Sequence, residues 1–330
     1  MRLPPHLVCL AMTGVLALSV VGCFGSPNGP PATPNVPVPE PPPPETPDGP
    51  AIPTPARMET PPETNVTAEP PAEPEIHIPY AVTEEAVPRV FFTNQVGRNV
   101  DSVFLDGQRL TNLQVGEIQT PRGITVDPVM QKIYWCDYGT HSIRRANFDG
   151  SDVEAVITDS AAGFRGIAVD GERQHIYWTD QELRAVFRAD CSGDQIETLI
   201  DTELEYPYAI ALDLQHGKLY VEDHAAQAIF RANLGGTEFE RFVELDIDER
   251  LIPSGLAIDV DHDTLYYAEG SIHGRIKRVS ISTPGVPTII REANVVRGLA
   301  IERSLQKLVW SEQVGEETVL RKSDLDGTDA

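Results

Sequence analysis

Two sets of acidic side chains recur along the chain, and carboxylates at regular spacing could hold a divalent cation or transfer protons. A catalytic or metal site uses one asymmetric group of residues, whereas these acids return in five repeats. We therefore interpret both sets as structural. The first set closes a four-residue aromatic motif and comprises Asp137, Asp180, Asp223, Glu269 and Glu312. The second set ends short apolar runs and comprises Asp127, Asp170, Asp213, Asp259 and Glu302.

Other signatures of catalysis are missing from the sequence. It contains no Ser-His-Asp order, no phosphate-binding glycine loop and no HExxH-like helix. We expect no enzymatic activity, no cofactor and no metal. The net charge of −24 argues against nucleic acid as a partner, because no basic stripe is present to neutralise phosphates. It favours neutral or basic partners.

The aromatic motif predicts the fold. Its six copies begin at residues 91, 134, 177, 220, 266 and 309, so the steps between them are 43, 43, 43, 46 and 43. A period in the low forties is typical of one β-propeller blade, a unit of four short strands. We expect an all-β protein with six blades, in which the aromatic residues pack one blade against the next. Besides the acids, we assign structural roles to Tyr134, Trp135, Tyr177, Trp178, Tyr220, Tyr266 and Trp310.

Two further positions repeat with the motif. A small residue lies eleven positions before five of its copies, as expected where inner strands crowd around a channel. A basic residue follows the motif, and we expect it to make polar contacts between blades. The small residues are Gly123, Gly166, Ala209, Gly255 and Gly298, and the basic residues are Arg145, Arg188, Arg231, Arg278 and Arg321.

The repeat resembles the YWTD module, the six-bladed propeller of the low-density lipoprotein receptor family. The signature is intact at Tyr177-Trp178-Thr179-Asp180, and the resemblance covers about residues 88–330. It implies a rigid, non-enzymatic platform for protein or peptide ligands. In that family, ligands use the face formed by the loops that enter the first strand and leave the second. In this chain that face would carry Arg122, Arg165, Tyr208, Ser254, Arg297, Tyr138, His141 and His224.

The sequence does not decide which segment closes the ring. Family modules close with a C-terminal segment that supplies the inner strand of the first blade, but here Ala330 lies only 21 residues beyond Val309. The sixth blade lacks an outer strand by this template. The stretch from Pro79 to Thr83 could supply the inner strand of the first blade, but not also that outer strand. A C-terminal truncation, imperfect closure and a partner that fills the gap are the alternatives.

The first 78 residues have a different character. Residues 1–22 have the features of an export signal, and Val20-Val21-Gly22-Cys23 resembles a bacterial lipobox, so Cys23 is the predicted lipidation site. An ordinary secretory signal is the alternative. Residues 23–78 form a Pro-rich segment that we expect to be a disordered tether. The propeller then spans residues 79–330. Cys136 and Cys191 are not expected to form a disulfide.

These features predict a non-enzymatic lipoprotein of the cell envelope, anchored on the periplasmic or extracellular face, whose propeller binds protein or peptide ligands. The alternative is a hydrolase or lactonase of the gluconolactonase type. Such a propeller holds a channel metal with Glu, Asn and Asp from its inner strands. Inner-strand positions here, such as Ile124 and Val126, are apolar instead.

Overall fold

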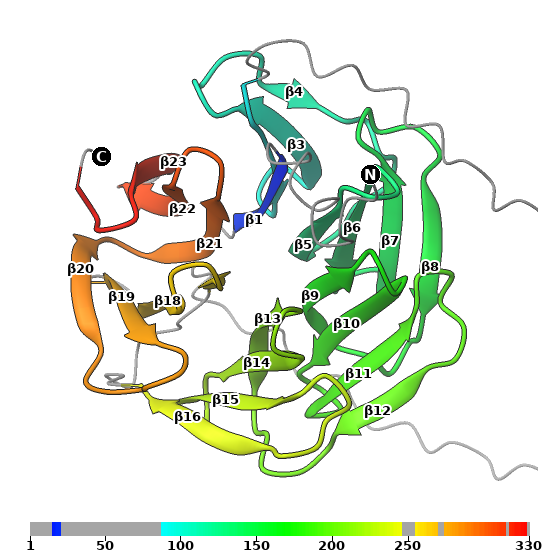
Figure 1. Ribbon diagram of the computed structural model, residues 1–330. Helices are drawn as coiled ribbons and strands as arrows, with labels where there is room; N and C mark the ends of the chain where they lie inside the picture. Colours follow the sequence, from blue (N-terminus) through cyan, green and yellow to red (C-terminus); the bar gives the residue numbers. More distant parts are fainter. Residues whose placement is uncertain (1–14, 21–86, 246–254, 270–273, 315–316, 329–330) are drawn as a thin grey trace, which may run out of the picture. The chain divides into compact units, whose positions relative to one another are not determined.

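Six small β-sheets make up the part of the chain that the computed structural model describes, which comprises residues 15–20, 87–245, 255–269, 274–314 and 317–328 (Figure 1). These residues contain strands and turns but no helix, as the spacing of the motif predicts. Within them, no helix long and apolar enough to cross a membrane is found. They all belong to one of the two units into which the chain divides.

The sheets follow one another along the chain, and each forms a blade with its strands ordered from the channel outward. The first blade contains β1 (Val15–Val20), β2 (Arg89–Asn94), β3 (Asn99–Phe104) and β4 (Thr111–Asn112). The second contains β5 (Pro121–Asp127), β6 (Lys132–Asp137), β7 (Ser142–Asn147) and β8 (Glu154–Thr158). The third contains β9 (Phe164–Asp170), β10 (His175–Asp180), β11 (Ala185–Asp190) and β12 (Glu197–Ile200).

The remaining blades continue the pattern. The fourth contains β13 (Pro207–Asp213), β14 (Lys218–Asp223), β15 (Ala228–Asn233) and β16 (Glu240–Glu244). The fifth contains β17 (Leu256–Asp259), β18 (Thr264–Glu269), β19 (Gly274–Ser280) and β20 (Thr288–Ala293). The sixth contains β21 (Val296–Glu302), β22 (Lys307–Val314) and β23 (Glu317–Asp324), and in the described residues it has these three strands.

The aromatic residues of the motif lie between blades. Tyr134 of the second blade packs in one cluster with Phe164 and Trp178 of the third. Trp135 and Trp310 are completely buried. Because a buried aromatic side chain removes roughly 150–250 Å² from water, this repeated packing is a main source of stability for the ring. All motif aromatics named from the sequence are buried.

The motif acids hold the loops at the blade ends. The carboxylate of Asp137, which is fully buried, accepts hydrogen bonds from the backbone N–H groups of Gln119 and Thr120, at 2.9 and 2.8 Å, and from that of Gly139. It thereby joins the loop that enters the inner strand to the loop that leaves the motif strand. Asp180 and Asp223 make the equivalent bonds in the next two blades.

The motif threonine connects neighbouring blades. The hydroxyl of Thr179 donates to the carbonyl oxygen of Tyr208, 2.7 Å away in the next blade, and accepts from the N–H of Gly166 at 2.8 Å. Gly166 itself lies so close to the backbone of Tyr208 that any Cβ would overlap the carbonyl oxygen. The small residue predicted at this position is therefore required by the approach of two inner strands.

The recurring cations also link blades, with one correction to the sequence prediction. Arg145 donates to the carbonyl oxygen of Cys191 in the next blade at 2.6 Å. In the sixth blade, the register pairs Val309 with Lys322, so Lys322 and not Arg321 takes the equivalent place. The reason is that β22 and β23 are strands of 8 residues each, so the residue paired with the start of the motif lies further along the chain than in the earlier blades. Arg321 lies near Glu312 instead, at 3.5 Å.

The inner position of the first blade has an occupant that the sequence did not predict. β1 lies there, parallel to β2, with Val15 opposite Arg89 and Val20 opposite Asn94. It contacts β21 on one side and β5 on the other (Figure 1). The candidate stretch from Pro79 to Thr83 lies outside the described residues. Cys136 and Cys191 are both buried free thiols.

Candidate functional site

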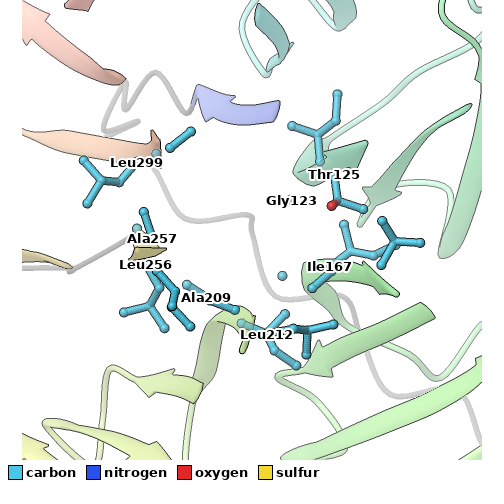
Figure 2. Close-up of a pocket in the computed structure, with 18 of the residues that line it drawn as sticks. Gly123, Thr125, Ile167, Ala209, Leu212, Leu256, Ala257 and Leu299 are labelled. Carbon is cyan, nitrogen blue, oxygen red and sulfur yellow. The ribbon is translucent and has the colours of Figure 1, made fainter. Parts of the chain in front are cut away.

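The inner strands surround a cavity of about 330 Å³ (Figure 2). Each inner strand that contributes Arg122, Arg165, Tyr208 or Arg297 does so at its second residue, and beyond that point Thr125 is the one polar side chain that the described strands add to the wall. Such a wall offers van der Waals contacts and no acid or base. Its apolar lining comprises Ile124, Val126, Ile167, Val169, Ile210, Leu212, Leu256, Ile258, Leu299 and Ile301.

Arg165 is the best-positioned polar group at the mouth of this cavity. Its side chain comes from β9 and is only 7% exposed. One guanidinium nitrogen, Nη2, donates to the hydroxyl of Tyr206 at 2.7 Å, and Nε is bonded to Gln181. The guanidinium carbon lies 5.0 Å from the ring centre of Tyr138, 5.5 Å from that of Tyr206 and 5.3 Å from that of Tyr208. Cation–π attraction from three rings thus fixes this side chain in one orientation.

Arg122 lies beside this cluster on the preceding inner strand. Its guanidinium carbon is 5.7 Å from the ring centre of Tyr138. We call Arg122, Tyr138, Arg165, Tyr206 and Tyr208 the arginine–tyrosine face. They come from three consecutive blades and meet because each lies at the start of an inner strand or just after a motif strand, at the same end of its sheet.

Tyr138 links the face to an acidic neighbour. Its hydroxyl donates to Oε1 of Glu182 at 3.1 Å. Burial and this hydrogen bond raise the pKa of Tyr138. Hydrogen bonds from Gln181 and Tyr138 lower the pKa of Glu182, so that carboxylate is charged at neutral pH. The face therefore presents cations with one adjacent anion.

Four further residues were predicted for the ligand face: His141, His224, Arg297 and Ser254. The ring of His141 lies 6.0 Å from that of Tyr138, and Nδ1 contacts the carbonyl oxygen of Ala162 at 2.8 Å. His224 packs edge-on against Tyr206, with 5.9 Å between ring centres. Arg297 lines the same cavity and is 6% exposed. Ser254 lies outside the described residues.

Sequence reasoning missed Tyr206, although it is the hydrogen-bond partner of Arg165. Its signal was weak, because it lies one residue before β13 and repeats in no other blade. Only the approach of the third and fourth blades brings it to Arg165.

A second missed residue is Glu222, at the third position of the fourth motif copy. It is fully buried, where Thr179 lies in the preceding blade. Its Oε2 accepts from the N–H of Gly255 at 3.2 Å, while Oε1 has no hydrogen-bond partner among the described residues. Burial raises the pKa of Glu222 to about 8, and the nearby Glu269 carboxylate adds to this. The side chain is therefore neutral at pH 7 and has no contact with solvent.

The environment of Glu222 continues into the fifth blade. Glu269 is 3% exposed and forms an ion pair with Lys277. The buried hydroxyl of Tyr267 has no hydrogen-bond partner in the described part of the chain. Burial and these two acids raise the pKa of Tyr267. The interface between the fourth and fifth blades thus contains buried acidic and phenolic groups beside its aliphatic and aromatic cluster.

The second set of acids does not face the cavity as a ligand group. Asp127 accepts from the backbone N–H groups of Val129 and Met130, and Asp213 accepts from the N–H of His216. Asp213 also lies 2.8 Å from Nδ1 of His216. In the described ranges, no group of three or more His, Cys, Asp or Glu side chains is placed to hold a metal ion.

Comparisons with known proteins agree with this architecture. The family model for the low-density lipoprotein receptor repeat class B matches residues 131–170 and 174–214. Among solved structures, a chain from "Crystal structure of Nidogen/Laminin Complex" is similar with a TM-score of 0.62 and 21% sequence identity. The match covers 72% of this chain and 89% of that one.

A second solved structure shares the fold. It is a gluconolactonase from Xanthomonas campestris, with a TM-score of 0.53 and 19% identity over 63% of this chain and 73% of the other. No curated protein matches the sequence. Together, the strand order and the repeat match show a six-bladed β-propeller of the YWTD type.

Proposed function

We propose that this YWTD-type β-propeller is a non-enzymatic binding module whose arginine–tyrosine face receives a protein or peptide ligand. The observation that carries the proposal is the fixed position of Arg165 among Tyr138, Tyr206 and Tyr208 at the mouth of an apolar cavity. Arginine and tyrosine are among the residues that contribute most to protein interfaces. A side chain that is already immobilised loses little entropy when a ligand binds.

The chemistry of the face indicates what a ligand would present. Guanidinium groups only donate hydrogen bonds, so Arg122 and Arg165 suit carbonyl or carboxylate oxygens. The apolar wall behind them suits an aliphatic group. The net charge of −24 favours the approach of a partner that is neutral or basic as a whole.

Two comparisons bear on the class of function. The nidogen/laminin structure concerns a protein complex, and its fold is similar to that of this chain. The gluconolactonase of similar fold is an enzyme. The described cavity wall carries hydrocarbon side chains where a metal-dependent hydrolase needs carboxylates, and we therefore favour binding over hydrolysis.

We further propose that the protein works at the cell envelope, with Cys23 as lipid anchor and residues 23–78 as tether. The support is the lipobox-like Val20-Val21-Gly22-Cys23 and the proline content of the segment that follows. Intact mass spectrometry of exported protein tests this. An unmodified Cys23 in a water-soluble product would disprove the anchor.

The binding proposal is tested by capture of partners from solubilised envelope proteins. We expect wild-type protein to retain a partner that Arg165→Ala loses. The matched control is Arg241→Ala, because Arg241 is a partly exposed arginine on the outer strand β16. Equal retention by all three proteins would show that the face is not the binding surface. A metal analysis and a lactonase screen on the same protein test the enzymatic alternative, and turnover that requires a bound divalent ion would support it.

A further inference from the structure

Exposed apolar side chains gather at one end of the ring. The inner strands start at the arginine–tyrosine face and run to the opposite end, where the motif strands start, as β5 and β6 do. We call this opposite end the turn face. Of the twelve large apolar side chains that are exposed in the described residues, nine lie in segments at the turn face: Val87, Leu110, Val129, Met130, Ile196, Leu214, Val286, Ile289 and Leu305. The other three are Val96, Leu183 and Val314. Because exposed apolar side chains are normally scattered, this uneven distribution indicates an interaction surface.

Five of these side chains lie where the channel opens at the turn face. They come just before a motif strand or from the four-residue turns that lead from an inner strand to a motif strand. We call them the collar, which comprises Val87, Val129, Met130, Leu214 and Leu305, each between 36% and 53% exposed. All but Leu214 belong to the sixth, first and second blades, which are neighbours in the ring. Leu214 and Arg303 also line the cavity, which therefore extends to this end.

Acidic side chains lie outside the collar on the same face. They belong to the turns that follow the third strands, and we call Asp149, Asp152, Asp194 and Asp326 the acidic rim. All four are exposed. Hydrogen bonds from Ser151 lower the pKa of Asp149, and hydrogen bonds from Thr328 lower the pKa of Asp326. Both carboxylates are therefore charged at neutral pH and remain so in mildly acidic solution.

Lysines of the same face are paired within the molecule. Lys218 lies 2.9 Å from a carboxylate oxygen of Glu238, and Lys307 lies 2.6 Å from one of Asp324. The rim acids instead accept hydrogen bonds from hydroxyl and amide groups of neighbouring residues. Such bonds satisfy the carboxylate oxygens without neutralising their charge. The turn face thus combines an apolar centre with a negative rim.

We propose that the turn face is a second docking surface, whose partner is a basic protein segment with an apolar side chain at its centre. Lysine or arginine side chains of the partner pair with the acidic rim, and the apolar side chain contacts the collar at the opening of the channel. The net charge of −24 attracts such a segment. It disfavours a second copy of this chain, because two negative rims would face each other. The proposal does not rest on the arginine–tyrosine face, which lies at the other end of the ring.

Binding of a defined probe to the full chain tests the collar. The probe is a short, fluorescently labelled synthetic peptide of leucine and lysine, amphipathic as a helix, and its anisotropy is measured at physiological salt concentration. The variant Met130→Ser with Leu305→Ser removes apolar groups from the collar. The matched control is Val96→Ser with Leu183→Ser, because these side chains are similarly exposed at the opposite end. We expect the collar variant to bind the probe about tenfold more weakly and the control to bind it as wild type does.

A second pair of variants tests the acidic rim. Asp149→Asn with Asp326→Asn removes two charges but keeps the oxygen that accepts hydrogen bonds within each turn. We expect weaker binding that also depends less on salt concentration. The control is Asp201→Asn with Glu203→Gln, which removes two exposed charges from the loop between β12 and β13, at the opposite end. Equal losses in both pairs would mean that the probe is attracted only by the net charge, and would overturn the proposal.

Hydrogen–deuterium exchange of the wild-type protein locates the probe without any substitution. We expect the probe to slow exchange in residues 128–131 and 303–306, and Arg165→Ala to bind it as wild type does. A probe that does not bind, that slows exchange only beside the arginine–tyrosine face, or that Arg165→Ala loses would overturn the proposal. The same holds if these turns are already protected without the probe, or if the protein in solution has twice the mass of one chain, because this chain or a second copy would then cover the turn face.

Discussion

Nζ of Lys322 in the last blade donates a hydrogen bond to the carbonyl oxygen of Leu105 in the first blade, at 3.0 Å. The two residues are 217 positions apart in the sequence. In the second and fourth blades, Arg145 and Arg231 make the same kind of bond to the next blade. The contact between Lys322 and Leu105 therefore repeats the ordinary link between blades at the point where the ring closes.

Lys322→Ala should weaken ring closure. We expect a loss of about 1 kcal/mol in the free energy of unfolding, less than is usual for a charged hydrogen bond, because the lysine is exposed and solvent screens its charge. Urea unfolding measures this. The control is Arg321→Ala, which removes a neighbouring cation that lies 3.5 Å from Glu312 of its own blade. An equal effect of both substitutions would show that the contact with Leu105 does not stabilise the ring.

Thr179→Val should destabilise the interface between the third and fourth blades. The substitution keeps the shape of the side chain but removes the hydroxyl that bonds Tyr208 and Gly166. Two buried backbone groups lose a partner, which costs roughly 1–3 kcal/mol. Thr179→Ser retains the hydroxyl and should lose clearly less. Denaturant unfolding compares the three proteins, and a valine variant as stable as the serine variant would contradict this role.

Glu222→Gln should stabilise the protein in a pH-dependent way. The pKa of Glu222 in the folded state is about 8, above its ordinary value of 4.5. Between these values the folded protein keeps a proton that the unfolded chain releases. Glu222 therefore lowers the free energy of unfolding by about 1.4 kcal/mol more for each unit of pH, and this loss is constant above pH 8. The glutamine variant lacks this cost.

The measurement is the difference in unfolding free energy between Glu222→Gln and wild type from pH 4.5 to pH 8. It should grow with pH in favour of the variant, apart from a constant offset from the changed hydrogen bond. The exposed substitution Glu172→Gln serves as control and should give a difference close to zero. A difference that stays the same at all pH values would mean that Glu222 is charged in the folded protein.

Gly166→Ala should force two inner strands apart. The new Cβ would overlap the carbonyl oxygen of Tyr208 and approach the backbone N of Ile210 to 3.0 Å. Overpacking of this kind costs roughly 1–3 kcal/mol. Gly235→Ala is the matched control, because no atom lies within 4 Å of its added Cβ. Thermal unfolding distinguishes the two, and equal melting temperatures would show that the strands separate without cost.

Much of the fold could be predicted because each blade is a local unit. The spacing of the motif predicts six blades, and the structure contains six sheets. The small residue before the motif predicts crowding, and Gly166 meets that expectation. The site was predicted less completely. Arg122, Arg165, Tyr138 and Tyr208 were named from the repeat, but Tyr206 was not, because it has no counterpart in other blades.

The residues that escaped prediction depend on neighbours from other blades. Lys322 takes the place expected for Arg321 because β22 and β23 are longer strands than those of the earlier blades, which shifts the pairing with Val309. Glu222 occupies the third position of its motif copy, as Thr179 does in the preceding blade. Only the packing of the fifth blade against it makes its carboxyl group buried and neutral.

The sequence by itself determined the class of fold, the number of blades and the end of each sheet at which the arginines and tyrosines lie, since these follow from contacts within one repeat. Only the tertiary structure decided that Arg165 is held by rings from the second and fourth blades, that Lys322 joins the last blade to the first, and that β1 lies beside β2. These arrangements join residues that are tens to hundreds of positions apart. Such pairings leave no periodic pattern along the chain, because they arise when separate blades pack around one channel.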